Sequence, residues 1–286
     1  MTNGLGALAN PGGRFGMVAL DQRESLRGLL SRTDRPAGDD ELRGFKAAAV
    51  RALSPLASAV LLDRPFGLSA AGTAVAPPAP YCGLILAVDD FDQPAGRPVR
   101  ASRLDPLATP ELIARAGAAA LKLLIIWRDG EDPGPRQRTV RDFLQLCRET
   151  GLPSILEGVV RPPLGSAEWA GPDQRAAAIV AAAREFGRSG PTLYKTEVPG
   201  DGRDPELVQR CGREISAALD GPWVVLSTGV SPEDFPGAVE AACRGGASGF
   251  LAGRGIWSEA ARSDDWAGAL ATTAVERLRR LLEVVA

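Results

Sequence analysis

The stretch Leu193-Tyr194-Lys195-Thr196-Glu197-Val198-Pro199 is the one from which the fold of this chain is best read. Apolar and β-branched residues ended by a proline are typical of a short buried strand, yet a lysine stands in its middle. Lysine is almost never fully buried without a reason, and burial lowers the pKa of its amine so that more of it is neutral and nucleophilic. Lys195 is therefore a candidate Schiff-base nucleophile, and an ion pair with Glu197 or another acid is the structural alternative.

Lysine is rare along the whole chain. Of the 33 basic residues, only Lys46, Lys122 and Lys195 are lysines, and the last two lie in strand-like runs. Arginine cannot be deprotonated in a protein and cannot form an imine, whereas lysine can. Lysines placed inside strands of a chain that otherwise uses arginine favour a chemical role.

Strand-like and helix-like segments alternate from end to end. Eight apolar runs are expected as strands, at 17–21, 58–63, 83–89, 121–127, 153–160, 193–198, 223–229 and 249–254. Helices are expected at 24–30, 39–52, 109–117, 137–150, 173–187 and 205–219, from a capping serine at 231, and at 267–285. Continuous apolar strands alternating with helices indicate a parallel sheet covered on its outer face.

Eight such units in 286 residues predict an α/β fold of the (β/α)₈ TIM-barrel type. We expect one domain over residues 1–286, with 1–14 as a flexible Gly/Ala-rich segment. A doubly wound open sheet is the alternative, although no G-x-G-x-x-G follows an early strand and no composition shift marks a second domain. The Gly/Pro-rich stretches 64–82, 90–108, 128–136 and 161–172 follow strand ends, where barrel loops build the active face.

Composition excludes several classes of function. A net charge of -2 offers no basic field for nucleic acid, and no run is long and apolar enough to span a membrane. The first residues do not form a secretory signal, and four scattered cysteines without a C-x-x-C pair are expected to be free thiols in a cytoplasmic protein. The absence of histidine removes Ser-His-Asp and Cys-His catalysis and most zinc sites, so we expect neither metal nor cofactor.

Polar residues gather where the expected strands end, which is the catalytic face of a barrel. They include Asp21, Gln22, Arg23, Asp63, Lys122, Glu157 and Lys195. Glu157 is either a structural acid or a general acid/base. Lys122 as a second cation would depress the pKa of the nucleophile. Asp21 would orient Lys195, bind a substrate hydroxyl or form a salt bridge with an arginine.

The ends of the seventh and eighth strands suggest a phosphate site, because barrels frequently bind phosphate there. The candidate residues are Ser227, Thr228, Gly229, Gly253 and Arg254. A serine hydroxyl, glycine N–H groups, a capped helix starting at Ser231 and the planar fork of an arginine all suit a phosphate. A simple turn beside a surface arginine is the alternative.

Five blocks in order resemble one family. They are Asp21-Gln22-Arg23-Glu24, Ala120-Leu121-Lys122-Leu123-Leu124, Val159-Val160-Arg161-Pro162-Pro163, Leu193-Tyr194-Lys195-x-Glu197-x-Pro199 and the block Gly246 to Arg254. Together they resemble the class I aldolases that include tagatose-1,6-bisphosphate aldolase. Leu124-Ile125-Ile126-Trp127-Arg128 brings the resemblance closest to the sulfofructosephosphate aldolase branch of sulfoquinovose breakdown.

The resemblance implies a TIM barrel in which Lys195 forms the imine and Glu157 transfers protons. It also implies that Asp21, Lys122, Gln22 and Arg23 line the pocket, and that the last two strand ends hold a phosphate on C1. Gly158 departs from the proline expected in relatives, and the loop 69–80 looks divergent.

The implied reaction is the cleavage of 6-deoxy-6-sulfofructose 1-phosphate to dihydroxyacetone phosphate and 3-sulfolactaldehyde. The substrate is thus a ketose phosphate with a second anionic end, and a homo-oligomer is expected from the family. A tagatose- or fructose-bisphosphate aldolase is the alternative, and a non-catalytic barrel that binds sugar phosphates is a third reading.

Overall fold

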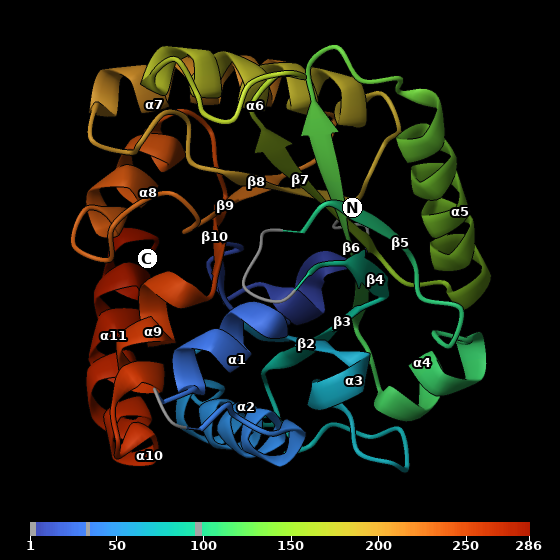
Figure 1. The fold of residues 1–286 in the computed structure, drawn as a ribbon, viewed down its shortest axis with the longest axis vertical. Helices are drawn as coiled ribbons and strands as arrows, with labels where there is room; N and C mark the ends of the chain where they lie inside the picture. The colour runs from blue at the N-terminus through green and yellow to red at the C-terminus, as the bar shows by residue number, and fades with distance from the viewer. Residues whose placement is uncertain (1–3, 33–34, 95–98) are drawn as a thin grey trace.

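Eight parallel strands close into a barrel in the computed structural model, which describes residues 4–32, 35–94 and 99–286 (Figure 1). The barrel strands are β1 Phe15–Leu20, β2 Ala59–Asp63, β3 Gly83–Ala87, β6 Ala120–Arg128, β7 Ser154–Arg161, β8 Leu193–Glu197, β9 Trp223–Leu226 and β10 Gly249–Ala252. Each strand pairs with its neighbours in this order, and β10 pairs with β1 to close the ring. The predicted (β/α)₈ barrel is confirmed, and the open sheet is excluded because no barrel strand is left as an edge.

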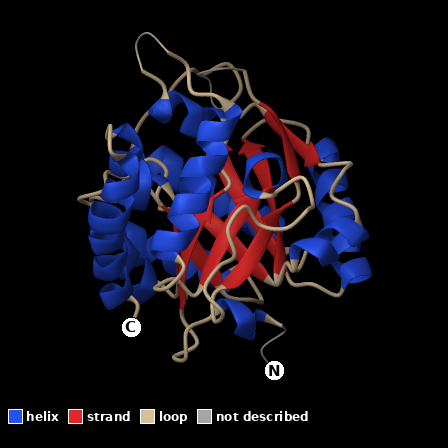
Figure 2. Cartoon of the chain, turned by 90° about the horizontal axis from the view of Figure 1, so that it is seen from below, coloured by secondary structure: helices blue, strands red, loops and turns tan. Residues whose placement is uncertain are grey.

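Helices surround the barrel (Figures 1 and 2). They are α1 Glu24–Leu30, α2 Asp39–Leu53, α3 Arg64–Gly67, α4 Pro110–Ala116, α5 Gly134–Thr150, α6 Pro172–Gly187, α7 Pro205–Ala217, α8 Phe235–Arg244, α9 Arg254–Arg262, α10 Trp266–Ala269 and α11 Val275–Val284. Local sequence sets several ends. For example, Thr109 Oγ1 accepts the N–H of Leu112 at the start of α4, and left-handed Gly117 ends that helix. Within the described part of the chain, no helix is long and apolar enough to cross a membrane.

Side chains alternate along each strand between two separate cores. Those facing outward pack against the helices in one large cluster. Those facing inward fill the barrel with a smaller cluster that includes Met17, Ile85 and Leu251. This alternation puts the inward face of each strand either in the interior or, near the strand's C-terminal end, at the mouth of the barrel.

The described part of the N-terminal segment is packed rather than loose. Leu5–Leu8 form a short 3₁₀ helix, and Leu8 is fully buried in the inward cluster. Gly83 permits this approach, since a Cβ there would lie 2.4 Å from the carbonyl oxygen of Ala7. The expectation of a flexible segment over 1–14 therefore does not fit Leu5–Leu8, and residues 1–3 lie outside the described residues.

Several element boundaries differ from those expected. The third barrel strand ends at Ala87, and the stretch expected as a loop contains an antiparallel hairpin of β4 Asp89–Asp92 and β5 Ala101–Leu104. Its acidic first strand lacks the apolar pattern of a buried strand. Sequence analysis also missed α9 after the eighth barrel strand, and it placed the start of α8 four residues early. The last helix carries a π-helical turn at Leu270–Ala274.

Because Leu8 fills the base of the barrel, replacing it should loosen the fold. We expect Leu8→Ala to lower the free energy of unfolding by about 2–4 kcal/mol, as for other buried leucines. The matched control is Gly6→Ala in the same short helix, where a Cβ meets nothing within 4 Å and the change should stay within about 0.5 kcal/mol. Urea denaturation of both variants checks this, and equal stability would show that the segment is not part of the core.

Candidate active site

Three strands bring two lysines and a glutamate to the mouth of the barrel. Lys122 lies on β6, Glu157 on β7 and Lys195 on β8, and all three are on the inward faces of their strands. Glu157 stands directly opposite Lys195 in the parallel register. The alternation of side chains along these strands thus brings the three side chains together.

Glu157 lies between the two lysines. Its Oε2 is 3.0 Å from Lys195 Nζ and 2.8 Å from Lys122 Nζ. Lys195 is 2% exposed and Glu157 is 5% exposed, so this contact is largely shielded from water. The ion pair that sequence analysis weighed for Lys195 exists, but with Glu157 rather than with Glu197. Glu197 instead accepts from Val160 N–H and pairs with Arg175 of α6.

Lys122 is the cation against which three buried carboxylates lie. Besides Glu157 it contacts Asp21 Oδ2 at 2.7 Å and Asp89 Oδ2 at 3.0 Å. Burial alone acts to lower the pKa of Lys122, but the three carboxylates outweigh it and raise that pKa well above its usual value. Burial acts to raise the pKa of Asp21, yet the neighbouring Lys122 and Lys195 hold it well below its usual range. Lys122 is therefore a permanent cation beside Glu157.

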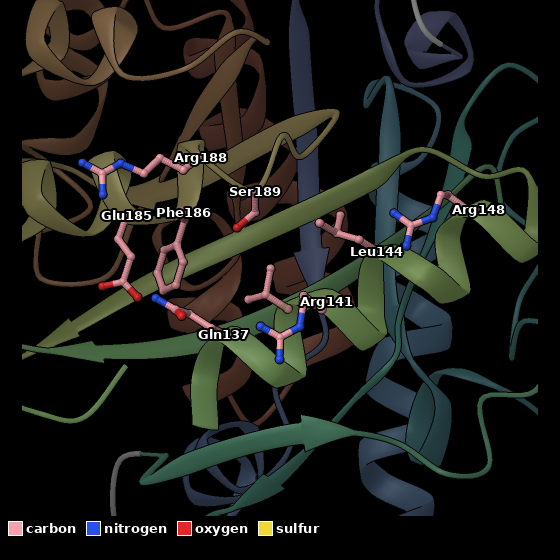
Figure 3. Close-up of a pocket in the computed structure, with 9 residues that line it drawn as sticks. Gln137, Arg141, Leu144, Arg148, Glu185, Phe186, Arg188 and Ser189 are labelled. Carbon is pink, nitrogen blue, oxygen red and sulfur yellow. The ribbon is translucent and has the colours of Figure 1, made fainter. Parts of the chain in front are cut away.

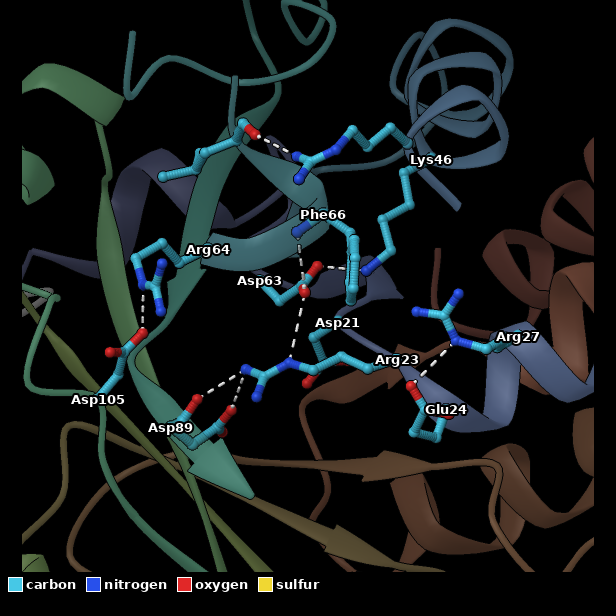
Figure 4. A network of polar contacts seen from close by, with 12 residues as sticks. Asp21, Arg23, Glu24, Arg27, Lys46, Asp63, Arg64, Phe66, Asp89 and Asp105 are labelled. Carbon is cyan, nitrogen blue, oxygen red and sulfur yellow. Dashed lines mark hydrogen bonds and ion pairs between the residues drawn. The ribbon is translucent and has the colours of Figure 1, made fainter. Parts of the chain in front are cut away.

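Arg23 is held by acids of the barrel rather than left free for substrate (Figure 4). Its Nη2 donates to the backbone oxygen of Asp89 at 2.7 Å, and its Nε lies 3.4 Å from Asp63 Oδ2. The guanidinium also stacks on the ring of Phe91, 4.5 Å from the centroid. The expectation that Arg23 contacts substrate therefore differs from its place in the structure, because two buried acids already use its charge.

The third lysine completes this network. Lys46 of α2 is fully buried and forms an ion pair with Asp63 at the end of β2. Sequence analysis gave no role to Lys46 or to Asp89. The rarity of lysine in this chain could have pointed to Lys46, and the position of Asp89 at the end of the third expected strand could have pointed to that acid. Neither signal named a partner, because the partners lie far away along the sequence.

The ends of β9 and β10 form the expected second part of the site. Ser227 Oγ accepts the N–H of Gly255 at 3.0 Å, so its own hydroxyl hydrogen is left to donate. Arg254 donates to Thr228 Oγ1 at 2.7 Å, and helix α9 begins at Arg254. A cavity of about 280 Å³ opens here. It is lined by Ser227, Thr228, Gly229, Arg254, Gly255 and Ser258, among others. A helix N-terminus, a hydroxyl and a guanidinium around one cavity suit a phosphate.

Glycines and one arginine shape this part of the mouth. Gly229 has φ +85°, and a Cβ there would lie 2.8 Å from Arg175 Nη2. Arg175 also bonds to the backbone oxygens of Val198 and Thr228, so it ties together the loops after β8 and β9. A Cβ at Gly253 would lie 2.7 Å from Gln22 Nε2, which places Gln22 against the start of α9. Sequence analysis did not single out Arg175, since it lies on a helix.

The glycine at position 158 is required by close packing. It points outward between β7 and the helices, where a Cβ would lie 2.2 Å from the hydroxyl oxygen of Tyr194 and 3.1 Å from the ring of Phe186. Tyr194 thus occupies the space that a larger residue at 158 needs. Since Glu157 points to the opposite face, this departure from the family pattern leaves the Glu157–Lys195 contact intact.

A separate groove lies on the outside of the barrel between α5 and α6 (Figure 3). It encloses about 440 Å³ and is lined by Gln137, Arg141, Arg148, Glu185, Phe186 and Arg188, among others. None of the candidate catalytic side chains lines it. The chemistry of the molecule belongs to the barrel mouth instead.

The fold and the site together define a class of protein. A barrel with a buried lysine beside a carboxylate at the C-terminal ends of its strands has the parts of a lysine-dependent aldolase. Residues 15–259 match the family model described as DeoC/LacD family aldolase. The chain belongs to this aldolase family, and it is an enzyme of the class I type.

Curated relatives agree with this assignment. The chain is 26% identical to a tagatose 1,6-diphosphate aldolase of Listeria monocytogenes over 281 residues, which covers 90% of this chain and 81% of the relative. It is 28% identical to tagatose 1,6-diphosphate aldolase 2 of Enterococcus faecalis over 311 residues, covering 98% and 91% respectively.

Solved structures match the fold over nearly the whole chain. One is a Schiff-base-forming fructose-1,6-bisphosphate aldolase, with a TM-score of 0.66, 17% identity and coverage of 100% of this chain and 99% of that one. Another is an archaeal fructose-1,6-bisphosphate aldolase with its catalytic lysine bound to the carbinolamine intermediate, with a TM-score of 0.64, 18% identity and coverage of 99% and 98%. At these identities the likeness shows the TIM-barrel fold.

The two lysines of the site should differ in what their removal does to stability. Lys122→Met leaves Asp21 and Asp89 buried without their shared lysine, and we expect it to lower the free energy of unfolding by about 3–5 kcal/mol. Lys195→Met is the matched control, because Glu157 keeps Lys122 as its partner, and we expect a loss of about 1 kcal/mol. Urea denaturation measures both, and equal losses would contradict the central place of Lys122 in the ion network.

Proposed function

We propose that this chain is a Schiff-base aldolase that cleaves 6-deoxy-6-sulfofructose 1-phosphate to dihydroxyacetone phosphate and 3-sulfolactaldehyde. The observation that carries the reaction type is the buried contact of 3.0 Å between Lys195 Nζ and Glu157 Oε2 at the barrel mouth. Membership of the DeoC/LacD family supports aldol chemistry. The block Leu124 to Arg128 and its neighbours support the sulfosugar substrate through their resemblance to that branch.

The first half of the proposed reaction forms the imine. The neutral amine of Lys195 attacks the C2 ketone of the substrate, and the resulting carbinolamine loses water. The protonated imine then withdraws electrons from the C3–C4 bond. Glu157 stands 3.0 Å from the amine, so it lies within reach for the proton transfers that carbinolamine formation and dehydration require.

The second half breaks the carbon–carbon bond. Glu157, directly or through a water, takes the proton of the C4 hydroxyl, the C3–C4 bond breaks, and its electrons move into an enamine on Lys195. The distal aldehyde leaves. The enamine takes a proton at C3, and water hydrolyses the imine to release dihydroxyacetone phosphate and restore the lysine.

The other candidate residues have positioning roles in this proposal. Lys122 holds Glu157 through the same Oε2 that contacts Lys195, and Asp21 is held by Lys122. Ser227, Thr228, Gly229 and Arg254 line the cavity at which the C1 phosphate would bind, and Gly253 directly precedes Arg254. Fixing both ends of the substrate supplies the orientation from which much of the acceleration arises.

A bisphosphate aldolase acting on tagatose or fructose 1,6-bisphosphate is the second candidate. The relatives from Listeria monocytogenes and Enterococcus faecalis are tagatose 1,6-diphosphate aldolases, which favours this reading. Both candidates share the imine chemistry and the C1 phosphate. They differ in the group on C6, which is a sulfonate in one and a phosphate in the other.

Borohydride trapping tests the imine. We expect incubation with dihydroxyacetone phosphate followed by reduction to place the adduct on Lys195, as read by peptide mass spectrometry. The chain has only two other lysines, Lys46 and Lys122, so the assignment is direct. An adduct on Lys122 would overturn the site assignment. No adduct on folded protein would overturn the mechanism and favour a sugar-phosphate-binding barrel.

Substrate comparison then decides the group on C6. We expect kcat/KM for sulfofructose 1-phosphate to exceed that for tagatose and fructose 1,6-bisphosphates, with activity unchanged by EDTA. A preference for either bisphosphate would replace the sulfosugar assignment by the second candidate.

Glu157→Gln separates imine formation from bond cleavage. Glutamine keeps the shape of the side chain but does not accept the C4 hydroxyl proton, so we expect kcat for cleavage to fall by about 10²- to 10⁴-fold. Reduction with borohydride after long incubation should still label Lys195. The control is Glu283→Gln, an exposed residue of α11, which should keep full activity. Cleavage at the native rate by Glu157→Gln would remove Glu157 from the mechanism.

A further inference from the structure

Two arginines stand at the ends of the strands that carry Lys122 and Glu157. Arg128 is the last residue of β6 and Arg161 the last of β7, and the two are partners in the parallel register. Arg128 lies on the same face of β6 as Lys122, and Arg161 lies on the same face of β7 as Glu157. Both side chains therefore belong to the mouth of the barrel and not to its outer, helix-covered face.

Neither arginine has an acid to neutralise it. Among the described residues no carboxylate pairs with either guanidinium. Arg161 donates only to backbone oxygens, to Val160 at 3.0 Å and Val99 at 3.3 Å. Arg128 Nε is buried and finds no hydrogen-bond acceptor in the described part of the chain. By contrast, Arg23 at the same end of the barrel does have acidic partners, since it lies against Asp63 and Asp89.

The pair adds to an excess of positive charge at this side of the mouth. Burial lowers the pKa of Arg161, and the nearby guanidinium groups of Arg128, Arg254 and Arg175 lower it further, while Glu197 acts in the opposite sense. Arg128 and Arg161 are half-buried, and cations that repel one another in a partly desolvated place are costly unless an anion joins them. The planar forks of two arginines match the three oxygens of a sulfonate or a phosphate.

The position of the pair relative to Lys195 suits one end of a substrate. In the barrel order, β8 with Lys195 lies between β7 and β9. Arg161 is one strand from Lys195 on one side and Arg128 is two strands away, while Arg254 follows β10, two strands away on the other side. Neighbouring strands are about 5 Å apart and residues rise about 3.3 Å along a strand, so the backbone of Arg161, four residues past the Glu157 that pairs with Lys195, lies roughly 14 Å from that of Lys195, toward the barrel mouth. The scissile bond of a chain bound at both ends would lie over Lys195.

We propose that Arg128 and Arg161 form the subsite that binds the second anionic group of the substrate, the tetrahedral oxyanion on C6. This inference rests on the proposed function, in which the C1 phosphate binds at Ser227 and Arg254. From the sequence, Gln22 and Arg23 were expected to line the pocket, and no residue was assigned to this group. The structure favours the new pair because Arg23 is already bound by two acids.

The test compares substrates with and without the C6 anion. We expect Arg128→Gln and Arg161→Gln to lower kcat/KM about 10- to 100-fold for sulfofructose 1-phosphate and for fructose 1,6-bisphosphate. For fructose 1-phosphate, which lacks an anion on C6, both variants should stay within about 3-fold of the native enzyme. The variant that loses more with the sulfonate than with the phosphate, or the reverse, shows which oxyanion the subsite fits. The control is Arg141→Gln on the outer face of α5, which should change neither ratio.

Two results would overturn the subsite. One is an equal loss with all three substrates, which would mean that the arginines support the fold or the lysine chemistry. The other is no loss with either C6 anion. Arg128→Lys keeps the charge but loses the fork, and an intermediate loss for the C6 anions alone is expected from it.

A binding measurement keeps the inference separate from the reaction. Phenylglyoxal modification of Arg128 and Arg161, read by peptide mass spectrometry, should be slowed by fructose 1,6-bisphosphate and not by fructose 1-phosphate. Labelling of Lys195 by dihydroxyacetone phosphate and borohydride is scored in each variant. Failure of that labelling in the native enzyme counts against the proposed function, whereas intact labelling without selective protection counts against the subsite alone.

Discussion

The arrangement of side chains at the barrel mouth depends on one buried cation, Lys122. Lys122 contacts Asp21, Asp89 and Glu157, which follow or lie on three different strands, and it is itself fully buried. Because an unpaired charge in such a place costs several kcal/mol, each acid favours only the arrangement that keeps it against the lysine. The ends of β1, β3 and β7 are thereby held together around β6. The same contacts fix Glu157 at hydrogen-bond distance from Lys195.

Around this cation the barrel distributes two kinds of arginine. Arg23 and Arg175 are paired with acids, and they hold strand ends and loops in place. Arg128, Arg161 and Arg254 reach the mouth without a carboxylate partner among the described residues. An arginine that is already paired acts on the protein itself, whereas an unpaired one is available to an anion from solution. This distinction between paired and unpaired arginines supports our proposal that the two anionic ends of the substrate bind on either side of Lys195.

The sequence predicted the fold, and three residues that it singled out, Lys122, Glu157 and Lys195, contact one another in the structure. Eight apolar runs and their helices indicated the barrel, and the strand ends indicated where Lys195, Glu157 and Lys122 would gather. It failed where the answer depended on a partner far away in the chain. Nothing near Asp89 indicates Lys122, and nothing near Arg23 indicates that Asp63 and Asp89 use its charge. The β4–β5 hairpin escaped prediction because its strands lack an apolar face.

The sequence by itself determined the type of fold, the scarcity of lysine and the residue types at each strand end, since these follow from periodicity and composition. It also determined that acid–base chemistry must proceed without histidine. Only the tertiary structure decided which charges neutralise one another. Closing the barrel sets the distances between strand ends, and those distances give Lys122 its three acids and Lys195 its glutamate. Among the described residues they leave Arg128 and Arg161 without an acid, because electrostatic partners are set by proximity in space and not by order along the chain.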